Sequence, residues 1–379
     1  MTNNQYVLLA GSKINAGDFL INHRAKELLT YLRPDRNLIE LDAWLPISDE
    51  QLEEINKSKA LILIGGPSVQ YDMYPGVYPL RKNLNDINVP IIMLGTGIKP
   101  VTGNWITTHK YNLSDNTLIL LNKINNNNYQ SGVRDYHTLS LLFNKGFKNI
   151  VMSGCPALYS LEHIDKKLEF NREIKNITFS AGVNFEKSPL SFKQMKEVIL
   201  FLKDNFRQAY LTVCFHHSID RDVYMKTHNA RKSFLESNLK FVNWLKSFNI
   251  NYKDISGSFE KLNNQYKNSD FHIGYRLHAH LYMCSVSRPT VLIAEDGRGV
   301  ASQPVTSSIV LNSHTGITNK YLRKMGGLFD KYRVNKYLLR DLSNVFEYEK
   351  KNNFSSIYLT RKAIDFHYQT MKQLIERLP

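Results

Sequence analysis

Short apolar runs that stop at glycine-rich turns constrain the fold of this chain more than any other feature. Residues 60–64 form such a run and end in a turn at residues 65–68, and residues 90–94 end in a second turn at residues 95–97. Uninterrupted apolar strands are typical of parallel sheets that helices cover on both faces. Since longer amphipathic segments alternate with these runs, the pattern predicts a doubly wound α/β domain.

A second set of strands and helices follows a polar stretch at residues 162–175. We therefore predict two doubly wound, Rossmann-like α/β domains that face a cleft, and a helical C-terminal tail. The expected boundaries are 1–165 for the N-terminal domain, 166–318 for the C-terminal domain and 319–379 for the basic tail. The strands expected in the second domain are residues 176–179, 209–215, 271–273 and 290–293.

Composition limits the partners and the compartment. The net charge of +15 favours an anionic partner, but the Lys and Arg residues are spread along the chain and form no nucleic-acid recognition motif. A basic, solvated surface explains this charge equally well. Cys155, Cys214 and Cys284 are too far apart in sequence for a disulfide framework. With no recognisable leader peptide and no membrane-length apolar run, these features predict a cytoplasmic protein.

Cationic side chains gather after two of the predicted strands. Arg276, His278 and His280 follow the strand at residues 271–273, and Arg298 follows the strand at residues 290–293. Ligands of open α/β sheets bind beyond the carboxyl ends of the strands. Because Arg holds carboxylates and phosphates and His exchanges protons near neutral pH, we expect a small anion to bind here. The alternative is a surface Arg with two packed His residues.

Other polar residues have both a functional and a structural interpretation. Arg134 could reach the anion across the cleft or form an ion pair with Asp135. His216 and His217 could contact substrate hydroxyls, but they lack a third metal ligand at a recognisable spacing. The carboxylates of Asp220 and Asp222 lie in a polar loop, where solvation explains them better than metal binding.

The glycine turns and the N-terminal segment could approach a sugar closely. Gly65 and Gly66 match no nucleotide-binding fingerprint, and tight turns that need positive φ explain them well. Asn15 and Asp18 precede or begin a predicted helix, where Asp18 could face the cleft.

Taken together, these segments resemble the polysaccharide pyruvyl transferase family. Arg276-Leu277-His278-Ala279 is the most specific segment of the resemblance. Weaker segments run from residue 15 to residue 298, so the resemblance covers most of the chain before residue 315. These weaker segments are Asn15–Asp18, Gly65-Gly66, Gly95–Gly97, Val133–Asp135, Gly154–Pro156 and Asp296–Arg298.

The resemblance implies a fold of the GT-B type and an enzyme that moves the enolpyruvyl group of phosphoenolpyruvate onto a sugar. The product would be a pyruvate ketal on a cell-surface polysaccharide or its lipid-linked precursor, and no metal or organic cofactor is expected. His278 would be the general acid. The implied donor ligands are Arg134, Arg276, Arg298 and His280, and the implied acceptor ligands are Asn15, Asp18, Gly65, Gly66, His216 and His217.

Some residues depart from the family pattern. Arg298 stands where a Lys is frequent, Cys155 stands where an Asp is common, and His280 has no fixed counterpart. A GT-B glycosyltransferase with a nucleotide-sugar donor is the alternative function, and a sugar-phosphate binding protein without catalysis is a third. The missing nucleotide fingerprint favours pyruvyl transfer.

The basic and aromatic tail raises a further hypothesis, which is peripheral contact with anionic lipid at the inner face of the membrane. A helical tail that braces the two domains is an equal alternative. The residues that suggest membrane contact are Tyr321, Arg323, Lys324, Lys331, Arg333 and Lys336.

Overall fold

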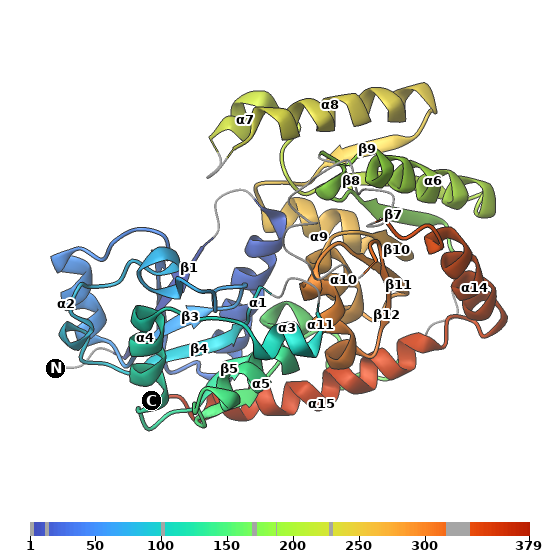
Figure 1. Cartoon of the computed structure of the whole chain (residues 1–379). Coiled ribbons are helices and arrows are strands. Elements are labelled where there is room, and N and C mark those ends of the chain that lie inside the picture. The colour runs from blue at the N-terminus through green and yellow to red at the C-terminus, as the bar shows by residue number, and fades with distance from the viewer. Residues whose placement is uncertain are drawn as a thin grey trace. The chain divides into compact units, whose positions relative to one another are not determined.

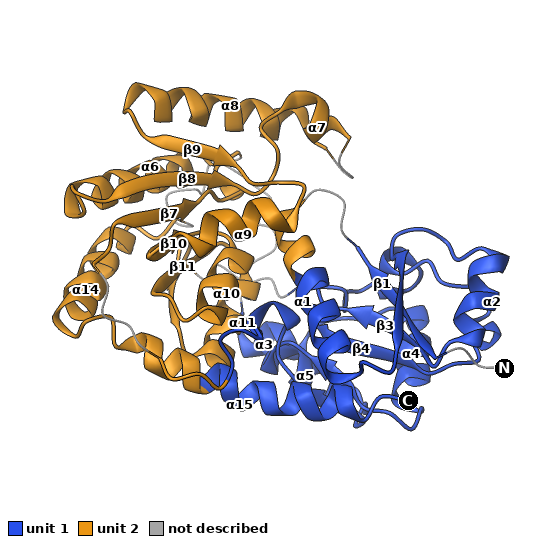
Figure 2. Ribbon diagram, turned by 180° about the vertical axis from the view of Figure 1, so that it is seen from behind, with its two compact units in different colours: residues 1–12, 21–164, 363–379 blue, residues 13–20, 165–362 orange. Residues whose placement is uncertain are grey.

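The chain forms two compact units, which Figure 2 shows in blue and orange. The computed structural model describes residues 4–11, 15–99, 103–168, 173–186, 188–226, 230–315 and 334–379. The first unit consists of residues 1–12, 21–164 and 363–379, and the second of residues 13–20 and 165–362. Within the described residues, no helix is both long and apolar enough to cross a membrane.

The first unit contains a six-stranded parallel sheet in the order β2-β1-β3-β4-β5-β6. Figure 1 labels β1, β3, β4 and β5 of this sheet. The chain reverses its direction of winding between β1 and β3, which lie side by side. The strands are β1 (Gln5–Ala10), β2 (Asn37–Asp42), β3 (Ala60–Ile64), β4 (Ile91–Thr96), β5 (Ser131–Val133) and β6 (Ile150–Met152). The helices are α1 (Ala16–Leu32), α2 (Asp49–Lys57), α3 (Trp105–His109), α4 (Asp115–Asn125) and α5 (Tyr136–Asn144), with shorter turns η1 (Met73–Val77), η2 (Leu84–Asp86) and η3 (Pro156–Leu158). The first turn of α1 belongs to the second unit.

Alternate strand residues build the core of the first unit. Val7, Leu61 and Met93 point to one face of the sheet, where they belong to one buried cluster with Ile55 of α2 and Leu121 of α4. β1, β3 and β4 are buried along their whole length. Strands buried on both faces leave little freedom for a register slip, which explains why the apolar runs predicted them well.

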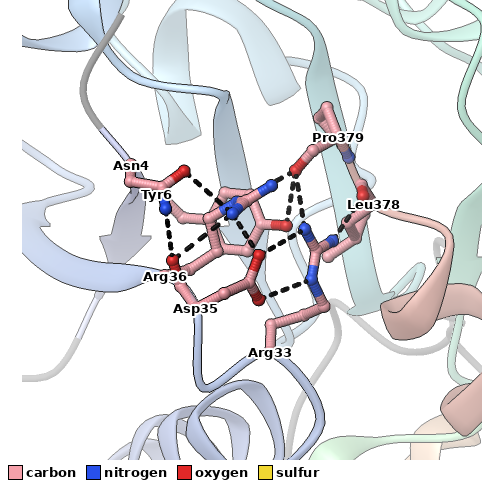
Figure 3. A network of polar contacts seen from close by, with 7 residues as sticks. All are labelled: Asn4, Tyr6, Arg33, Asp35, Arg36, Leu378 and Pro379. Carbon is pink, nitrogen blue, oxygen red and sulfur yellow. Dashed lines mark hydrogen bonds and ion pairs between the residues drawn. The ribbon is translucent and has the colours of Figure 1, made fainter.

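The end of the chain packs into the first unit, as Figure 3 shows. Tyr6 of β1 donates a hydrogen bond of 2.7 Å to the main-chain oxygen of Pro379. Arg33 and Arg36 lie with their guanidinium carbons 5.6 and 5.8 Å from the centroid of the Tyr6 ring, and both donate to the same oxygen. Asp35 pairs with both guanidinium groups. These contacts hold the C-terminal segment of the chain against β1.

The second unit contains another six-stranded parallel sheet, in the order β12-β11-β10-β7-β8-β9. Its strands are β7 (Asn176–Ser180), β8 (Tyr210–Phe215), β9 (Asn251–Asp254), β10 (Phe271–Gly274), β11 (Thr290–Ala294) and β12 (Ile309–Asn312). Its helices are α6 (Pro189–Asn205), α7 (Arg221–Met225), α8 (Lys232–Ser247), α9 (Phe259–Lys267), α10 (Leu277–Ser285), α11 (Gly297–Thr306) and α14 (Leu338–Lys351), with the short turn η4 (Asn184–Glu186); α15 (Ser356–Glu376) begins in this unit and ends in the first.

The two faces of the second sheet differ in polarity. Phe179, Phe215 and Ile273 point to an apolar face that α6, α8 and α14 cover. The strand residues that alternate with these, such as Ser180 and His272, lie on the other face and make buried hydrogen bonds. From β7 the chain adds β8 and β9 on one side of the sheet. It then crosses back and adds β10, β11 and β12 on the other side. β7 and β10 are therefore neighbours at a topological switch point, where open α/β sheets bind ligands.

The structure confirms the predicted fold class of two doubly wound α/β units with helices at the C-terminal end. Two of the predicted strands agree closely with β3 and β11. Most of the basic and aromatic residues proposed for membrane contact, Tyr321 to Arg333, lie outside the described residues, so the membrane hypothesis stays a prediction.

Candidate active site

The switch point of the second unit brings the ends of β7 and β10 into close contact. Gly274 has φ of +152°, and a Cβ added there would lie 2.5 Å from the backbone nitrogen and oxygen of Ser180. Only glycine fits such a close approach. The main-chain N–H groups of Tyr275 and Arg276 both donate to Ser180, at 2.9 Å to its carbonyl and 3.1 Å to its hydroxyl. The turn that leads into α10 is therefore fixed on Ser180.

Arg276 lies at this turn with its guanidinium held on one side. Its Nη2 donates to Oδ1 of Asn15 at 3.2 Å and to Nε2 of His217 at 3.3 Å. Because a guanidinium only donates, Nε2 of His217 accepts and its proton is on Nδ1. No other described side chain accepts a hydrogen bond from this guanidinium, so Nε and Nη1 remain for a ligand. A charged N–H group of Arg forms a short, strong hydrogen bond with a carboxylate or phosphate.

Helix α10 starts directly after Arg276 and has no side-chain cap at its N-terminus. The neighbouring helices α9 and α11 are capped by Ser258 and Asp296, whose side chains accept from the first turn. The N-terminus of a helix attracts anions through its free N–H groups and its dipole. Arg276 and the first turn of α10 thus present positive charge together at the carboxyl end of the sheet.

His278 lies in the first turn of α10 and is 9% exposed. Its imidazole packs against the start of α1, because a Cβ added to Gly17 would overlap with Nδ1 and the adjoining ring atoms. Gly17 and Asp18 belong to the second unit, like Arg276. The structure thus brings Asn15, Asp18, Arg276 and His278 together in one unit.

The other predicted histidines are neutral. Burial and the charges of Arg276 and Arg231 lower the pKa of His217 to about 3. Burial lowers the pKa of His280 to about 3, and its two ring nitrogens bond to Thr290 and Ser308. His216 is buried, its pKa is lowered first by burial, and Nε2 bonds to the hydroxyl of Tyr266 at 2.7 Å. The structure therefore places the side chains of His280 and His216 in the core of the second unit.

Arg298 and Asp296 form an ion pair beside the site. Nη2 of Arg298 lies 2.6 Å from Asp296, and Nε makes two further contacts with the same carboxylate. Burial is the largest effect on the pKa of Arg276 and lowers it. The negative charge of Glu295 raises this pKa, and the positive charge of Arg298 lowers it further. Arg298 is thus close to the site, but its own guanidinium already has an anionic partner.

Glu295 is a residue of this site that the sequence analysis missed. Its carboxylate accepts hydrogen bonds from the main-chain N–H groups of Val183 and Asn184, at 3.0 and 2.9 Å. Burial raises its pKa to about 7, against these hydrogen bonds and the charge of Arg276, which lower it. Its position directly after β11 was the only sequence signal that could have indicated a site residue. Its hydrogen-bond partners could not be predicted, because they lie more than a hundred residues earlier in the chain.

Arg134 belongs to the first unit and is 7% exposed. Its Nη2 donates to the carbonyl of Ile98 at 2.7 Å, and its Nε lies 3.3 Å from Asp135. Asp135 also caps α5 by accepting from the N–H of Thr138. The structural alternative for Arg134, an ion pair with Asp135, is thus present.

The two glycines after β3 differ in their surroundings. Gly65 has φ of +46°, and the side chain of Ile21 fills the space where its Cβ would be. Gly66 has φ of +73°, and no atom of the described residues lies within 4 Å of a Cβ position there. Both need the left-handed conformation that glycine adopts at low cost, and only Gly66 is open to an approaching group.

The structure places Asp222 in the first turn of α7 and Asp220 directly before that helix, so Asp222 does not lie in the expected polar loop. Asp220 caps α7 by accepting a hydrogen bond of 2.9 Å from Val223. In the part of the chain that the structure describes, no group of three His, Cys, Asp or Glu side chains could hold a metal ion.

Comparisons with known proteins agree with the fold and give the family. A UDP-GlcNAc 2-epimerase from Neisseria meningitidis, bound to UDP-GlcNAc, is 10% identical over 98% of this chain and 99% of its own, with a TM-score of 0.52. A Listeria monocytogenes protein assigned as a UDP-N-acetylglucosamine 2-epimerase is 10% identical over 100% of this chain and 99% of its own, also with a TM-score of 0.52. These similarities confirm the expected GT-B-like fold and carry nothing about activity.

A search of curated protein sequences found no match to this chain. The profile of the polysaccharide pyruvyl transferase family matches residues 15–297, which include Asn15, Arg134, Arg276 and His278. This match covers well over half of the chain and spans both units, so the chain belongs to the polysaccharide pyruvyl transferase family.

Proposed function

We propose that this protein transfers the enolpyruvyl group of phosphoenolpyruvate to a sugar of a cell-surface polysaccharide or of its lipid-linked precursor, with release of phosphate. The observation that carries the proposal is the position of Arg276. It lies at the switch point of the second sheet, directly before an uncapped helix that carries His278. Family membership supports a pyruvyl transferase, and the geometry suggests which residues hold the donor.

Phosphoenolpyruvate has a carboxylate and a phosphate on one carbon, and Arg276 with the start of α10 suits this pair of anions. Nε and Nη1 of Arg276 point to different sides of the guanidinium, and each would donate one charge-assisted hydrogen bond to the donor. The N–H groups at the start of α10 would bind the donor as well. Asn15 and His217 would keep the guanidinium in place through Nη2, which gives Asn15 a role on the donor side rather than on the expected acceptor side.

His278 is our candidate for the general acid. It follows Arg276 by two residues, so a ligand held by Arg276 and the first turn of α10 would lie next to its imidazole. His217 and His280 would not serve as the acid, because their pKa values near 3 leave both neutral. A bound dianion next to His278 favours its charged form, which is the form that delivers a proton.

The reaction balances without a further reactant. His278 protonates the methylene carbon of phosphoenolpyruvate, and the positive charge develops on the adjoining carbon. A sugar hydroxyl attacks that carbon and loses its proton, and the carbon–oxygen bond to phosphate breaks. A second hydroxyl closes the ketal and loses its proton. Of the two protons lost by the hydroxyls, one replaces the proton given by His278 and the other leaves with phosphate. General acid catalysis of this kind contributes about a hundredfold to ten-thousandfold in rate.

Incubation with phosphoenolpyruvate and a panel of free and lipid-linked glycosides tests the proposal. We expect phosphate release only with a suitable glycoside, and a product that is heavier than the glycoside by one pyruvate less one water. Sugar transfer from a nucleotide sugar, with no phosphate released from phosphoenolpyruvate by any glycoside, would favour the glycosyltransferase alternative.

A further inference from the structure

A continuous chain of buried hydrogen bonds runs from Arg276 through the polar face of the second sheet. The hydroxyl of Ser180 lies 2.9 Å from Nε2 of His272, and Nδ1 of His272 lies 2.8 Å from the hydroxyl of Thr290. Thr290 continues to His280 at 2.9 Å, and His280 to Ser308 at 2.6 Å. All five side chains are at most 9% exposed. Buried polar groups destabilise a core unless they are satisfied, so a connected chain such as this one specifies a single arrangement.

The direction of donation along these hydrogen bonds follows from the contacts at the two ends of the series. Ser180 accepts from the main-chain N–H of Arg276 at 3.1 Å. At the far end Ser308 lies 2.6 Å from the hydroxyl of Thr306, which donates to the carbonyl of Ser302 at 3.0 Å. Burial lowers the pKa values of His272 and His280, so each imidazole is neutral, donates from one nitrogen and accepts at the other.

One direction of donation satisfies every member of the chain. Ser180 donates to His272, His272 to Thr290, and Thr290 to His280. From His280 the same direction continues through Ser308 and Thr306 to the carbonyl. In the reverse direction the hydroxyl of Ser180 would need a different acceptor. His272 therefore accepts at Nε2, and this fixes the orientation of the Ser180 hydroxyl.

We propose that Ser180 and His272 are positioning residues, which fix the main chain of Arg276 and the start of α10 for binding of the donor anion. This role rests on the donor site of the proposed function. The hydroxyl of Ser180 accepts from the N–H of Arg276, its main-chain carbonyl accepts from the N–H of Tyr275, and Gly274 allows this close contact. His272 holds the hydroxyl of Ser180 in the orientation that accepts from Arg276. Neither side chain needs to touch the substrate.

The chain offers a matched control for this proposal. Ser269 is 1% exposed, and its hydroxyl bonds to Thr178 and to the carbonyl of Gln265 in the same unit. Its hydrogen bonds do not lead to Arg276. Ser180→Ala and Ser269→Ala remove the same atom from equally buried sites, so their difference isolates the link to Arg276 from a general loss of stability.

Two measurements test the proposal. In calorimetric titration with phosphoenolpyruvate, Ser180→Ala should raise Kd about threefold to tenfold, which is the range for one lost hydrogen bond, and Ser269→Ala should leave Kd within twofold. Ser180→Ala combined with His272→Gln should weaken binding no more than the stronger single variant, because both act through one path. Equal effects of Ser180→Ala and Ser269→Ala, or additive effects in the double variant, would overturn the proposal.

Hydrogen exchange gives the second measurement and needs no ligand. The peptide that spans residues 274–280 should exchange faster in Ser180→Ala than in the wild type or in Ser269→Ala at matched stability. Unchanged exchange in Ser180→Ala would contradict the positioning role. A wild-type protein that binds no phosphoenolpyruvate would refute the proposed donor site, and the exchange experiment would still decide whether Ser180 fixes the turn.

Discussion

Gly17 leaves the space that the imidazole of His278 occupies, since a Cβ at residue 17 would overlap with Nδ1 of that ring. The contact joins the first turn of α1 to the first turn of α10, and both turns belong to the second unit. A glycine at position 17 is thus required by the position of a side chain and not by a positive φ. This relationship links the Asn15–Asp18 segment to the candidate general acid.

Replacement of Gly17 by Ala should displace His278 and lower turnover. If the effect passes through the imidazole, Gly17→Ala should lower turnover at least tenfold in the wild type and much less in a His278→Ala background. Turnover of the two single variants and the double variant measures this coupling. An equal fractional loss in both backgrounds would mean that Gly17 matters for a reason other than His278.

Replacement of His278 by Asn should lower turnover while donor affinity stays within a few-fold of the wild type. An amide forms hydrogen bonds but cannot deliver a proton, so the loss falls on the transition state. We expect turnover to fall by about two to four orders of magnitude. Steady-state kinetics and a phosphoenolpyruvate titration separate the two effects. Near-normal turnover in His278→Asn, with an inactive His217→Asn or His280→Asn, would place the acid elsewhere.

Glu295 should make the stability of the protein depend on pH. Burial raises its pKa from 4.5 to about 7, so the folded state binds its proton more tightly than the unfolded state. Its stabilising contribution is therefore full below pH 4.5 and is lost as the pH rises through about 7. The free energy of unfolding of the wild type, relative to Glu295→Gln, should fall by roughly 1–3 kcal/mol over this window.

Denaturant unfolding at several pH values measures this dependence. Glu236→Gln is a suitable control, because Glu236 is an exposed glutamate of α8 in the same unit. Parallel pH profiles for the wild type and Glu295→Gln would show that the Glu295 carboxyl does not titrate in this range.

Turnover should continue in the presence of a chelator. In the proposed site the charge of the donor is balanced by Arg276 and the start of α10, so no divalent cation is needed to hold the phosphate. Phosphate release with and without chelator measures this. Activity that is abolished by chelator and restored by added manganese or magnesium would favour a nucleotide-sugar glycosyltransferase.

The sequence predicted strands better than it predicted contacts. β3 and β11 are buried on both faces, and their continuous apolar runs matched the structure. His280 was predicted as a donor ligand from its place near Arg276 alone. It is the fourth residue of α10, where the helix turns its side chain toward the core and Thr290 and Ser308 bind it.

Contacts between segments far apart in sequence could not be predicted from local patterns. Asn15 binds Arg276 across 261 residues, and the segment 13–20 packs with the second unit although residues around it belong to the first. Ser180 meets Arg276 only because β7 and β10 are neighbours, which depends on the order of strands in the sheet. A list of strands does not fix that order.

Titration with phosphoenolpyruvate, compared between Arg276→Ala and Arg207→Ala, tests the central claim most directly. Arg207 is exposed and precedes the start of β8, so its removal changes the net charge equally without touching the carboxyl end of the sheet. We predict that the wild type and Arg207→Ala bind phosphoenolpyruvate with the same affinity. Arg276→Ala should bind about tenfold to a hundredfold more weakly, which corresponds to the loss of one charge-assisted hydrogen-bonded contact. Unchanged affinity in Arg276→Ala would contradict the assignment of the donor site.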